Sequence, residues 1–262
     1  MNNLNDLTIK LVNDFKIKSD NENGQNFLVD EEILMQEINE AELEKDDIVL
    51  DIGAGFGSIE SEVRKICKII AVEKEVKCYS YLLDKYEIDK NVEIINADAL
   101  DIVYPKFTKI IANPPYNIID RIIEKISNYD FNIGVMIIPK TIAEQLYSQE
   151  NKTSFSAIQK VFIDFKKIAD VPKNSFYPEP RVTSTMIKLR KIKNNILQEI
   201  FKRREMTVKN AIINATLSIQ NKTKRESKKE FYEYSKDIRD IENKQVKSLN
   251  LSEINLIIDM FK

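Results

Sequence analysis

Short apolar runs alternate with amphipathic segments between residues 48 and 150. The apolar runs predict buried strands at 48–52, 68–72, 92–95, 109–112 and 133–138. Between them, apolar residues recur at helical spacing, as at 58–66 and 118–126, and predict helices. This alternation is typical of an α/β fold, in which a mostly parallel sheet carries helices on both faces.

The segments on either side of this core show other patterns. Helical spacing predicts an N-terminal amphipathic helix over 4–15, and Asp30 is a typical N-cap for a second helix. The polar stretch 18–23 between them predicts a loop. After residue 150, β-rich runs at 157–169 and 182–189 predict an antiparallel addition at the edge of the sheet.

The composition shifts at about residue 192, beyond which helical periodicity dominates and glycine and proline are absent. We therefore expect two domains, an α/β domain at 1–191 and a small helical domain at 192–262.

Basic residues gather around the start of the second domain. They predict either a surface that binds the phosphates of a nucleic-acid backbone or an ordinary solvated helix surface. They are Lys188, Arg190, Lys191, Lys193, Lys202, Arg203, Arg204, Lys209, Lys222, Lys224, Arg225, Lys228 and Lys229.

The composition excludes several classes of protein. With 43% hydrophobic and 31% charged residues, the chain is globular and not disordered. The absence of histidine rules out His-based triads and His-ligated metal sites. Cys67 and Cys78 lack the spacing of a metal or redox site, which favours reduced thiols in an intracellular protein. No stretch has the length of a membrane span and no signal pattern precedes the first helix, so we expect a cytoplasmic protein that binds no membrane.

Three of the five glycines, Gly53, Gly55 and Gly57, directly follow the first strand of the core. Glycines at such a corner let the backbone pass close to a ligand and turn into a helix, although a tight turn alone explains them too. Glu73 ends the next strand about 20 residues later, where this topology grips a ribose diol. Asp98 follows the third strand and predicts either an acceptor for an adenine amino group or a turn cap.

The tetrapeptide Asn113-Pro114-Pro115-Tyr116 follows the fourth strand. Two prolines end the strand in a stiff turn at its carboxyl end, where open α/β sheets bind ligands. The turn presents an amide side chain, a free carbonyl and an aromatic ring, which suit an exocyclic amine on a flat base. The same dipeptides also occur in ordinary turns.

The loop 171–181 contains three prolines and presents Phe176. A stiff loop with an aromatic side chain is a candidate second stacking surface for a base. The alternative is a phenylalanine that packs under its own loop.

Together these stretches resemble the ribosomal RNA adenine N6,N6-dimethyltransferase family, which uses S-adenosylmethionine (AdoMet). The matching motifs occur in family order over nearly the whole chain. The first motif and the phenylalanine loop are specific to this family and its macrolide-resistance relatives. The motifs are GQNFL at 24–28, DIGAGFG at 51–57, AVE at 71–73, NADAL at 96–100, NPPY at 113–116, VPKNSFYPEPRVTS at 171–184 and RREMTVKNAI at 203–212.

The resemblance implies a Rossmann-like methyltransferase fold with a helical C-terminal domain that contacts RNA. It implies methylation, and expected dimethylation, of adenine N6 in small-subunit ribosomal RNA by a monomer that acts on a precursor of the small subunit in ribosome biogenesis. Asn113, the Pro114 carbonyl, Tyr116 and Phe176 would hold the target adenine. The residues expected to bind AdoMet are Gln25, Asn26, Leu28, Gly53, Gly55, Gly57, Glu73, Asp98 and Asn113.

The chain departs from the family pattern at several positions. Pro114 stands where the family usually has leucine; proline is typical there of DNA adenine methyltransferases and glutamine-modifying enzymes. Three further departures each remove an expected RNA contact: the polar stretch 19–23, the absence of the expected arginine in the segment 139–145, and Met206 in place of a lysine. These changes indicate a divergent member.

Two alternatives follow from these departures. The first is the same chemistry on DNA adenine or a protein glutamine, which the pairing of GQNFL with the Phe176 loop disfavours. The second is an assembly factor that binds RNA and keeps the fold with little catalysis. The intact glycine corner, Glu73, Asp98, Asn113 and Tyr116 argue against it.

Overall fold

The structure is a computed structural model that describes residues 3–17, 25–220, 222–234 and 236–261. The predicted loop at 18–23 and Gly24 of the GQNFL motif lie outside these residues. The chain divides into two compact units. The sheet unit comprises Met1–Tyr147 and Phe165–Lys191, and the helical unit comprises Ser148–Asp164 and Ile192–Lys262.

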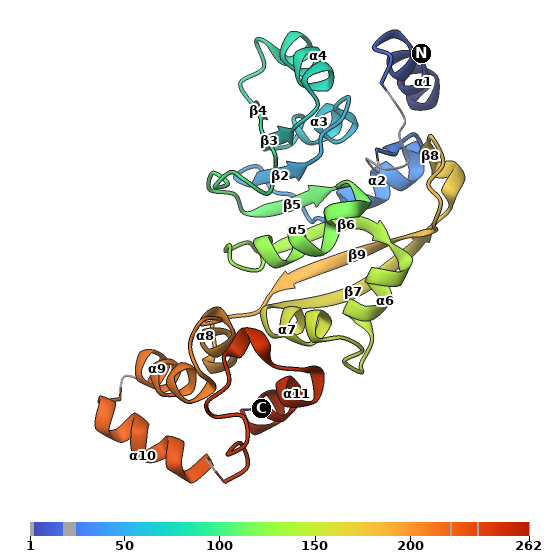
Figure 1. The fold of residues 1–262 in the computed structure, drawn as a ribbon. Coiled ribbons are helices and arrows are strands. Elements are labelled where there is room, and N and C mark those ends of the chain that lie inside the picture. Colours follow the sequence, from blue (N-terminus) through green and yellow to red (C-terminus); the bar gives the residue numbers. More distant parts are fainter. Residues whose placement is uncertain (1–2, 18–24, 221, 235, 262) are drawn as a thin grey trace. The chain divides into compact units, whose positions relative to one another are not determined.

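A seven-stranded sheet forms the centre of the sheet unit in the described part of the chain (Figure 1). Neighbours from β4 to β6 pair in parallel, and β9 pairs antiparallel to β6 with β7 beyond it. The predicted parallel sheet with an antiparallel edge is therefore confirmed. Its strands, in spatial order, are β4 (Val92–Asn96), β3 (Lys68–Glu73), β2 (Ile48–Ile52), β5 (Lys109–Ala112), β6 (Ile133–Pro139), β9 (Ser184–Lys191) and β7 (Ile163–Val171).

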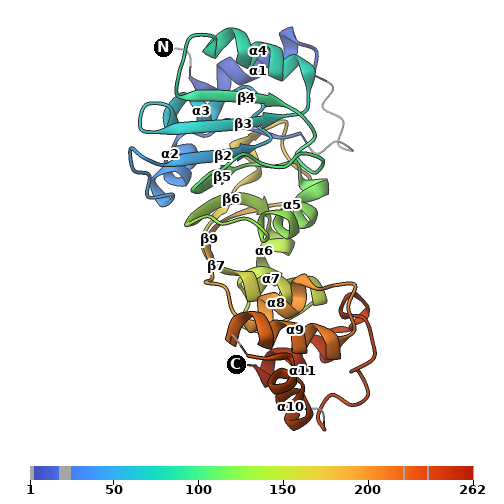
Figure 2. The ribbon, with the colours of Figure 1, turned by 90° about the vertical axis from the view of Figure 1, so that its left-hand side faces the viewer.

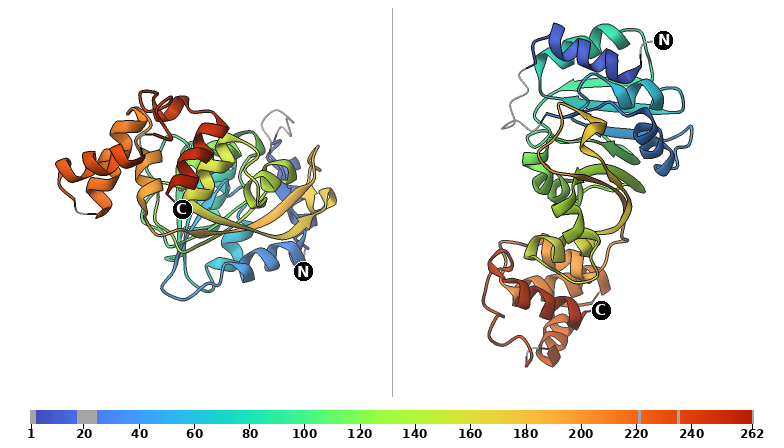
Figure 3. Two further views of the ribbon diagram at one scale, coloured as in Figure 1. Left: turned by 90° about the horizontal axis from the view of Figure 1, so that it is seen from below. Right: turned by 90° about the vertical axis from the view of Figure 1, so that its right-hand side faces the viewer.

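Helices cover both faces of this sheet. Leu34 of α2 packs with Val49 and Ile111 of the sheet in one buried cluster, which also includes α3. Side chains alternate along a strand, so Leu50 and Ile110 point to the opposite face, where α5 lies (Figure 3, left). The helices of this unit are α1 (Leu4–Asp14), α2 (Glu31–Glu40), α3 (Ser58–Val63), α4 (Val76–Tyr86), η1 (Tyr116–Ile118), α5 (Ile119–Ile126), α6 (Lys140–Tyr147) and η2 (Lys173–Ser175).

A short two-stranded sheet joins the GQNFL segment to the proline-rich loop. Strand β1 (Phe27–Leu28) pairs antiparallel with β8 (Phe176–Tyr177). Next to this pair, the Ser175 hydroxyl donates to Asp30 Oδ2 at 2.9 Å. Asp30 also caps α2, as predicted, by accepting from the backbone N–H groups of Glu32 and Ile33.

The prediction of a β-rich run over 157–169 is wrong in its first half. Residues Ser154–Phe162 form helix α7, and strand β7 begins only at Ile163. Thr153 and Ser156 form a capping box that starts the helix, and Ala157 and Val161 are buried one helical turn apart. A short apolar run fits a buried helix as well as a strand, so periodicity alone could not separate them.

Helix α7 belongs to the helical unit, beside α8 (Figure 2). The Gln198 side chain of α8 donates to the Val161 carbonyl at 3.0 Å. Residues 148–164, which the expected division placed in the first domain, therefore pack with 192–262. The other helices of this unit are α8 (Ile196–Lys202), α9 (Val208–Gln220), α10 (Lys224–Tyr234), η3 (Val246–Ser248) and α11 (Leu251–Met260).

Candidate functional site

The glycine corner brings the proline turn onto the end of strand β2. All three glycines have positive φ, a conformation that L side chains rarely adopt. A Cβ on Gly53 would lie 3.2 Å from the Pro115 side chain and 3.6 Å from Pro114 Cα, and a Cβ on Gly55 would lie 3.0 Å from the Phe27 ring. Glycine is therefore needed for the turn and the N-terminal segment to approach this corner.

Glu73 lies at the carboxyl end of β3 with 6% of its surface exposed. Its carboxylate accepts from the backbone N–H groups of Gly55 and Glu75, each at 2.7 Å. Burial raises the pKa of Glu73, and these hydrogen bonds oppose that rise. The backbone N–H of Lys74 also acts on this carboxylate. A carboxylate can accept about four hydrogen bonds, so capacity remains for a hydroxyl group of a ligand.

Asp98 is held by two contacts of its own unit. Its Oδ1 accepts from the backbone N–H of Leu100 at 2.9 Å. This hydrogen bond is the turn cap that the sequence predicted as one of two roles for Asp98. Its Oδ2 lies 2.8 Å from the Lys74 ammonium group, and this hydrogen bond lowers the pKa of Asp98. A contact between Asp98 and an adenine amino group remains a prediction.

A cavity of ≈ 390 Å³ opens at the carboxyl ends of these strands. Its volume falls within the range of small-molecule sites. A neighbouring cavity of ≈ 120 Å³ is lined by Asp51, Leu28 and Gly57. Seven of the expected site residues line the larger cavity, namely Gln25, Asn26, Gly53, Gly55, Glu73, Asp98 and Asn113.

Asn113 borders both cavities. Its side-chain Nδ2 donates to Glu37 Oε2 at 3.1 Å. Its Oδ1 is buried and has no hydrogen-bond partner within the described protein. Sequence reasoning missed Glu37, although the signal was present: Glu37 shares the buried helical face of Leu34 and Ile38.

The structure does not place the expected base-holding residues together in a cavity wall. Asn113 borders both cavities, whereas Pro114, Tyr116 and Phe176 are not among the described residues that line them. The Tyr116 hydroxyl is hydrogen-bonded to Ser184, which fixes the ring at the start of β9. Burial raises the pKa of Tyr116 to about 12, so this hydroxyl is neutral at physiological pH.

Phe176 occupies the position that the alternative reading predicted. Its side chain is 3% exposed and packs in the main core cluster with Leu28 and Leu34. Pairing of β8 with β1 sets this orientation, because neighbouring residues of a strand point to opposite faces and Tyr177 takes the outer one. A stacking role for Phe176 requires its ring to leave this position.

Three fully or nearly fully buried carboxyl groups lie behind the glycine corner. Burial raises the pKa of Glu37 to about 8 and that of Glu60 to about 7. Burial, and then the charge of Glu60, raises the pKa of Asp51 well above its usual range. A hydrogen bond also joins the Asp51 and Glu60 side chains, which share a proton between them. Within the part of the chain that the structure describes, no group of three or more acidic or cysteine side chains could hold a metal ion.

Comparison with known proteins decides the family. The model of the ribosomal RNA adenine dimethylase family matches residues 16–262. The chain belongs to this family. Similar family members include the probable ribosomal RNA small subunit methyltransferase A of Methanosarcina barkeri, 34% identical over 72% of this chain and 71% of the relative. The protein of that name from Methanosphaera stadtmanae is 26% identical over 96% of this chain and 98% of the relative.

Two solved structures support the Rossmann-like methyltransferase fold that the motifs predicted. A dimethyladenosine transferase from Plasmodium falciparum matches with a TM-score of 0.62 at 24% identity, over 90% of this chain and 97% of the other. The 23S rRNA methyltransferase ErmE matches with a TM-score of 0.61 at 17% identity, over 90% and 99%. At these identities the likeness shows the fold alone.

Proposed function

We propose that this chain transfers methyl groups from AdoMet to N6 of an adenine in small-subunit ribosomal RNA. The observation that carries the proposal is the proline turn seated on Gly53. This turn sets Asn113, whose buried amide oxygen lacks a partner in the described protein, in the wall of a cavity of ≈ 390 Å³ that Glu73 also lines. Membership of the adenine dimethylase family supports the choice of adenine.

The residues of the two cavities suit AdoMet. Glu73 retains capacity for a ribose hydroxyl, and Asp98 lines the same cavity and would accept from an adenine amino group. Asp51 lines the smaller cavity and would receive the cationic amino-acid end. When bound, AdoMet supplies a methyl group on a sulfonium, which departs as a neutral thioether.

The protein's own groups would activate the target amine. The N6 lone pair of adenine is delocalised into the ring, so this amine is a poor nucleophile. Asn113 Oδ1 and the Pro114 carbonyl accept its two hydrogens in the proposed mechanism and favour a tetrahedral nitrogen. Each such preorganised group can lower the barrier by about 3 kcal/mol. The proton of the methylated amine passes to water, which accords with a chain that lacks histidine.

Base flipping brings the adenine to this turn in the proposed mechanism. Stacking on an aromatic ring contributes roughly 1–3 kcal/mol per base and offsets the few kcal/mol that unstacking costs. Tyr116 provides one such ring, anchored by its hydroxyl at Ser184. Phe176 provides the second only after it leaves the core.

The helical unit would contribute the RNA contacts through its exposed basic helix α10. The proposal includes action as a monomer on a small-subunit precursor in the cytoplasm. Among the described helices, none is long and apolar enough to cross a membrane.

The test is methyl transfer from labelled AdoMet to small ribosomal subunits that lack adenine dimethylation. Naked ribosomal RNA, DNA and a protein extract are assayed in parallel. Label recovered as N6-methylated or N6,N6-dimethylated adenosine in ribosomal RNA supports the proposal and gives the number of methyl groups. Label in DNA or protein glutamine, or AdoMet binding without transfer to any substrate, contradicts it.

A further inference from the structure

Glu37 is a buried carboxyl group that is hydrogen-bonded to Asn113 of the candidate site. Its side chain is 0% exposed, and its Oε2 accepts from Asn113 Nδ2 at 3.1 Å. Its other oxygen has no partner in the described part of the protein. Burying a carboxyl group that is only half satisfied lowers stability, and a leucine at this position of α2 would pack at lower cost. The contact with Asn113 is the feature that offsets this cost.

The orientation of the Asn113 amide determines what the target amine meets. The oxygen and nitrogen of an asparagine side chain are nearly the same shape, so the amide can turn over within one site. With the oxygen toward the ligand, Asn113 accepts an N6 hydrogen. With the nitrogen there, two donors face each other and the amine is not activated. An acceptor behind Nδ2 selects the first orientation.

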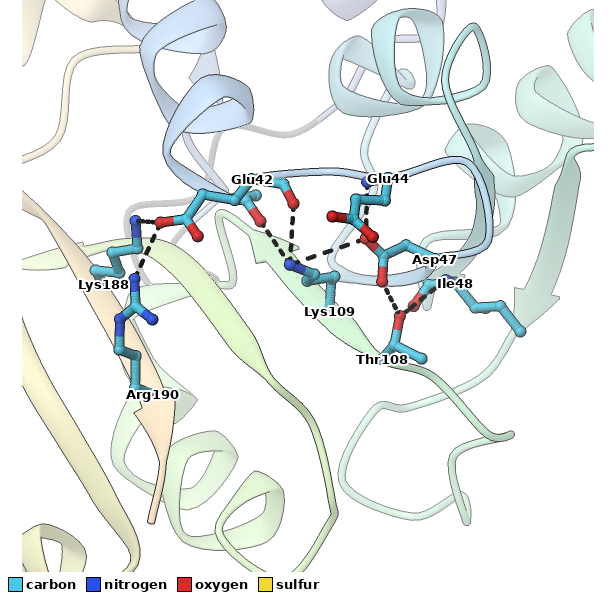
Figure 4. A network of polar contacts seen from close by, with 9 residues as sticks. Glu42, Glu44, Asp47, Ile48, Thr108, Lys109, Lys188 and Arg190 are labelled. Atoms are coloured by element: carbon cyan, nitrogen blue, oxygen red, sulfur yellow. Dashed lines mark hydrogen bonds and ion pairs between the residues drawn. The ribbon is translucent and has the colours of Figure 1, made fainter. Parts of the chain in front are cut away.

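Helix α2 is fixed at both ends, so Glu37 is held at a defined place. At its N-terminus, Asp30 caps the helix and accepts from Ser175. At its C-terminus, Lys109 donates to the carbonyls of Ala41 and Glu42, at 3.1 and 3.0 Å (Figure 4). Lys109 begins the same strand, β5, that leads into Asn113.

A second strand holds the same end of α2. Lys188 of β9 lies 2.6 Å from Glu42 Oε1, and Arg190 lies 3.0 Å from the same oxygen (Figure 4). Lys188 also lies 3.1 Å from Glu40 Oε2. The C-terminal end of the helix that carries Glu37 is therefore tied both to the start of β5, the strand that leads into Asn113, and to β9.

We infer that Glu37 is a positioning residue for Asn113: it accepts the amide hydrogen and turns Asn113 Oδ1 toward the target amine. The inference rests on the proposed function for its catalytic consequence, whereas the contact stands without it. Burial raises the pKa of Glu37 to about 8, so the neutral acid dominates at pH 7 and accepts through its carbonyl oxygen. Glutamine reproduces that acceptor, and leucine does not.

The first measurement is the side-chain amide signal of Asn113 in ¹⁵N-labelled protein without AdoMet, assigned by its loss in Asn113→Ala. Glu37→Leu should shift this signal and speed its hydrogen exchange, and Glu37→Gln should leave it close to that of the native protein. Glu32→Leu is the matched control, because Glu32 is exposed on the same helix. It should change nothing.

The second measurement is the rate of methyl transfer. Glu37→Leu should lower kcat by about 10–100-fold, by analogy with the loss of a group that orients a metal ligand. AdoMet affinity should stay within a few-fold, and Glu37→Gln should keep kcat within a few-fold of the native value. Circular dichroism of each variant confirms that it is folded.

The inference is overturned if Glu37→Leu leaves the Asn113 signal or kcat unchanged, or if leucine and glutamine lower kcat equally. If the native protein transfers no methyl group while Glu37→Leu still shifts the Asn113 signal, the proposed function fails and the contact remains. The two failures are therefore distinguishable.

Discussion

At the scale of single residues, the candidate site contains a buried polar atom without a partner. Asn113 Oδ1 accepts no hydrogen bond within the described residues. A buried polar atom without a partner costs roughly 1–3 kcal/mol. Gly53 makes the arrangement possible because a side chain there would meet the proline turn.

Asn113→Ala should lower methyl transfer by at least about 100-fold, because it removes the acceptor that activates the amine. AdoMet affinity should remain within a few-fold, because the larger cavity keeps Glu73 and Asp98. Single-turnover transfer and equilibrium binding of AdoMet measure the two quantities. Loss of binding together with transfer would assign Asn113 to the cofactor instead.

Glu60→Gln should raise the melting temperature at pH 8 and have little effect at pH 5. The pKa of Glu60 is raised from 4.5 to about 7 in the folded protein, so the folded state binds the proton more tightly than the unfolded state. The stability contributed by this group is full below about pH 4.5 and is lost as the pH rises through about 7. Glutamine cannot ionise and avoids that loss. Thermal unfolding between pH 5 and 8 measures the effect, and a difference independent of pH would contradict it.

At the scale of elements, helix α2 links the N-terminal motif to the proline-rich loop. Asp30 lies two residues after β1 and caps α2, and it accepts from Ser175 directly before β8. The segment that follows GQNFL and the loop 171–181 therefore meet at one carboxylate. The two-stranded sheet β1–β8 alone is too short to be stable, so this contact and the core hold it.

Asp30→Ala should lower the free energy of unfolding by about 1–3 kcal/mol, because it removes both a helix cap and the contact with Ser175. Asn3→Ala is the matched control. Asn3 caps α1 through the N–H of Asn5, so its loss should cost no more than about 1 kcal/mol. Urea unfolding of both variants provides the comparison. Equal losses would show that the Ser175 contact contributes nothing.

At the scale of the whole molecule, many of the basic residues near the C-terminal domain form ion pairs within the protein. Lys188 and Arg190 pair with Glu42, Lys202 and Arg203 pair with Glu199, and Lys222 pairs with Glu230. Helix α10 instead exposes Lys224, Arg225, Lys228 and Lys229, none of which belongs to an ion pair in the described regions. A surface that binds the phosphates of a nucleic-acid backbone is therefore best sought on α10.

Replacing Lys228 and Lys229 together by glutamate should weaken RNA binding and reduce its dependence on salt. The slope of log K against log salt concentration should fall by roughly 1 for each lysine that contacts a phosphate. Lys90→Glu with Lys106→Glu is the control, because it makes the same change in net charge at exposed lysines of the sheet unit. Equal weakening by the two pairs would indicate a general charge effect.

The sequence determined much of the sheet and several of the residues that line the larger cavity. Strand positions, the cap at Asp30 and the carboxylate at Glu73 follow from periodicity and spacing, which act over a few residues. Seven of the residues expected to bind AdoMet or the base meet at one cavity, because parallel strands end at the same edge of a sheet.

Only the tertiary structure decided the features that depend on contacts distant in sequence. Residues Ser154–Phe162 form a helix because their apolar side chains are buried against α8 and α11. The tertiary structure also placed Phe176 in the core through the register of β1 with β8. It brought Glu37 to Asn113 across 76 positions of the chain. Periodicity records which face of an element is buried, whereas the partner on that face is fixed by how the elements pack.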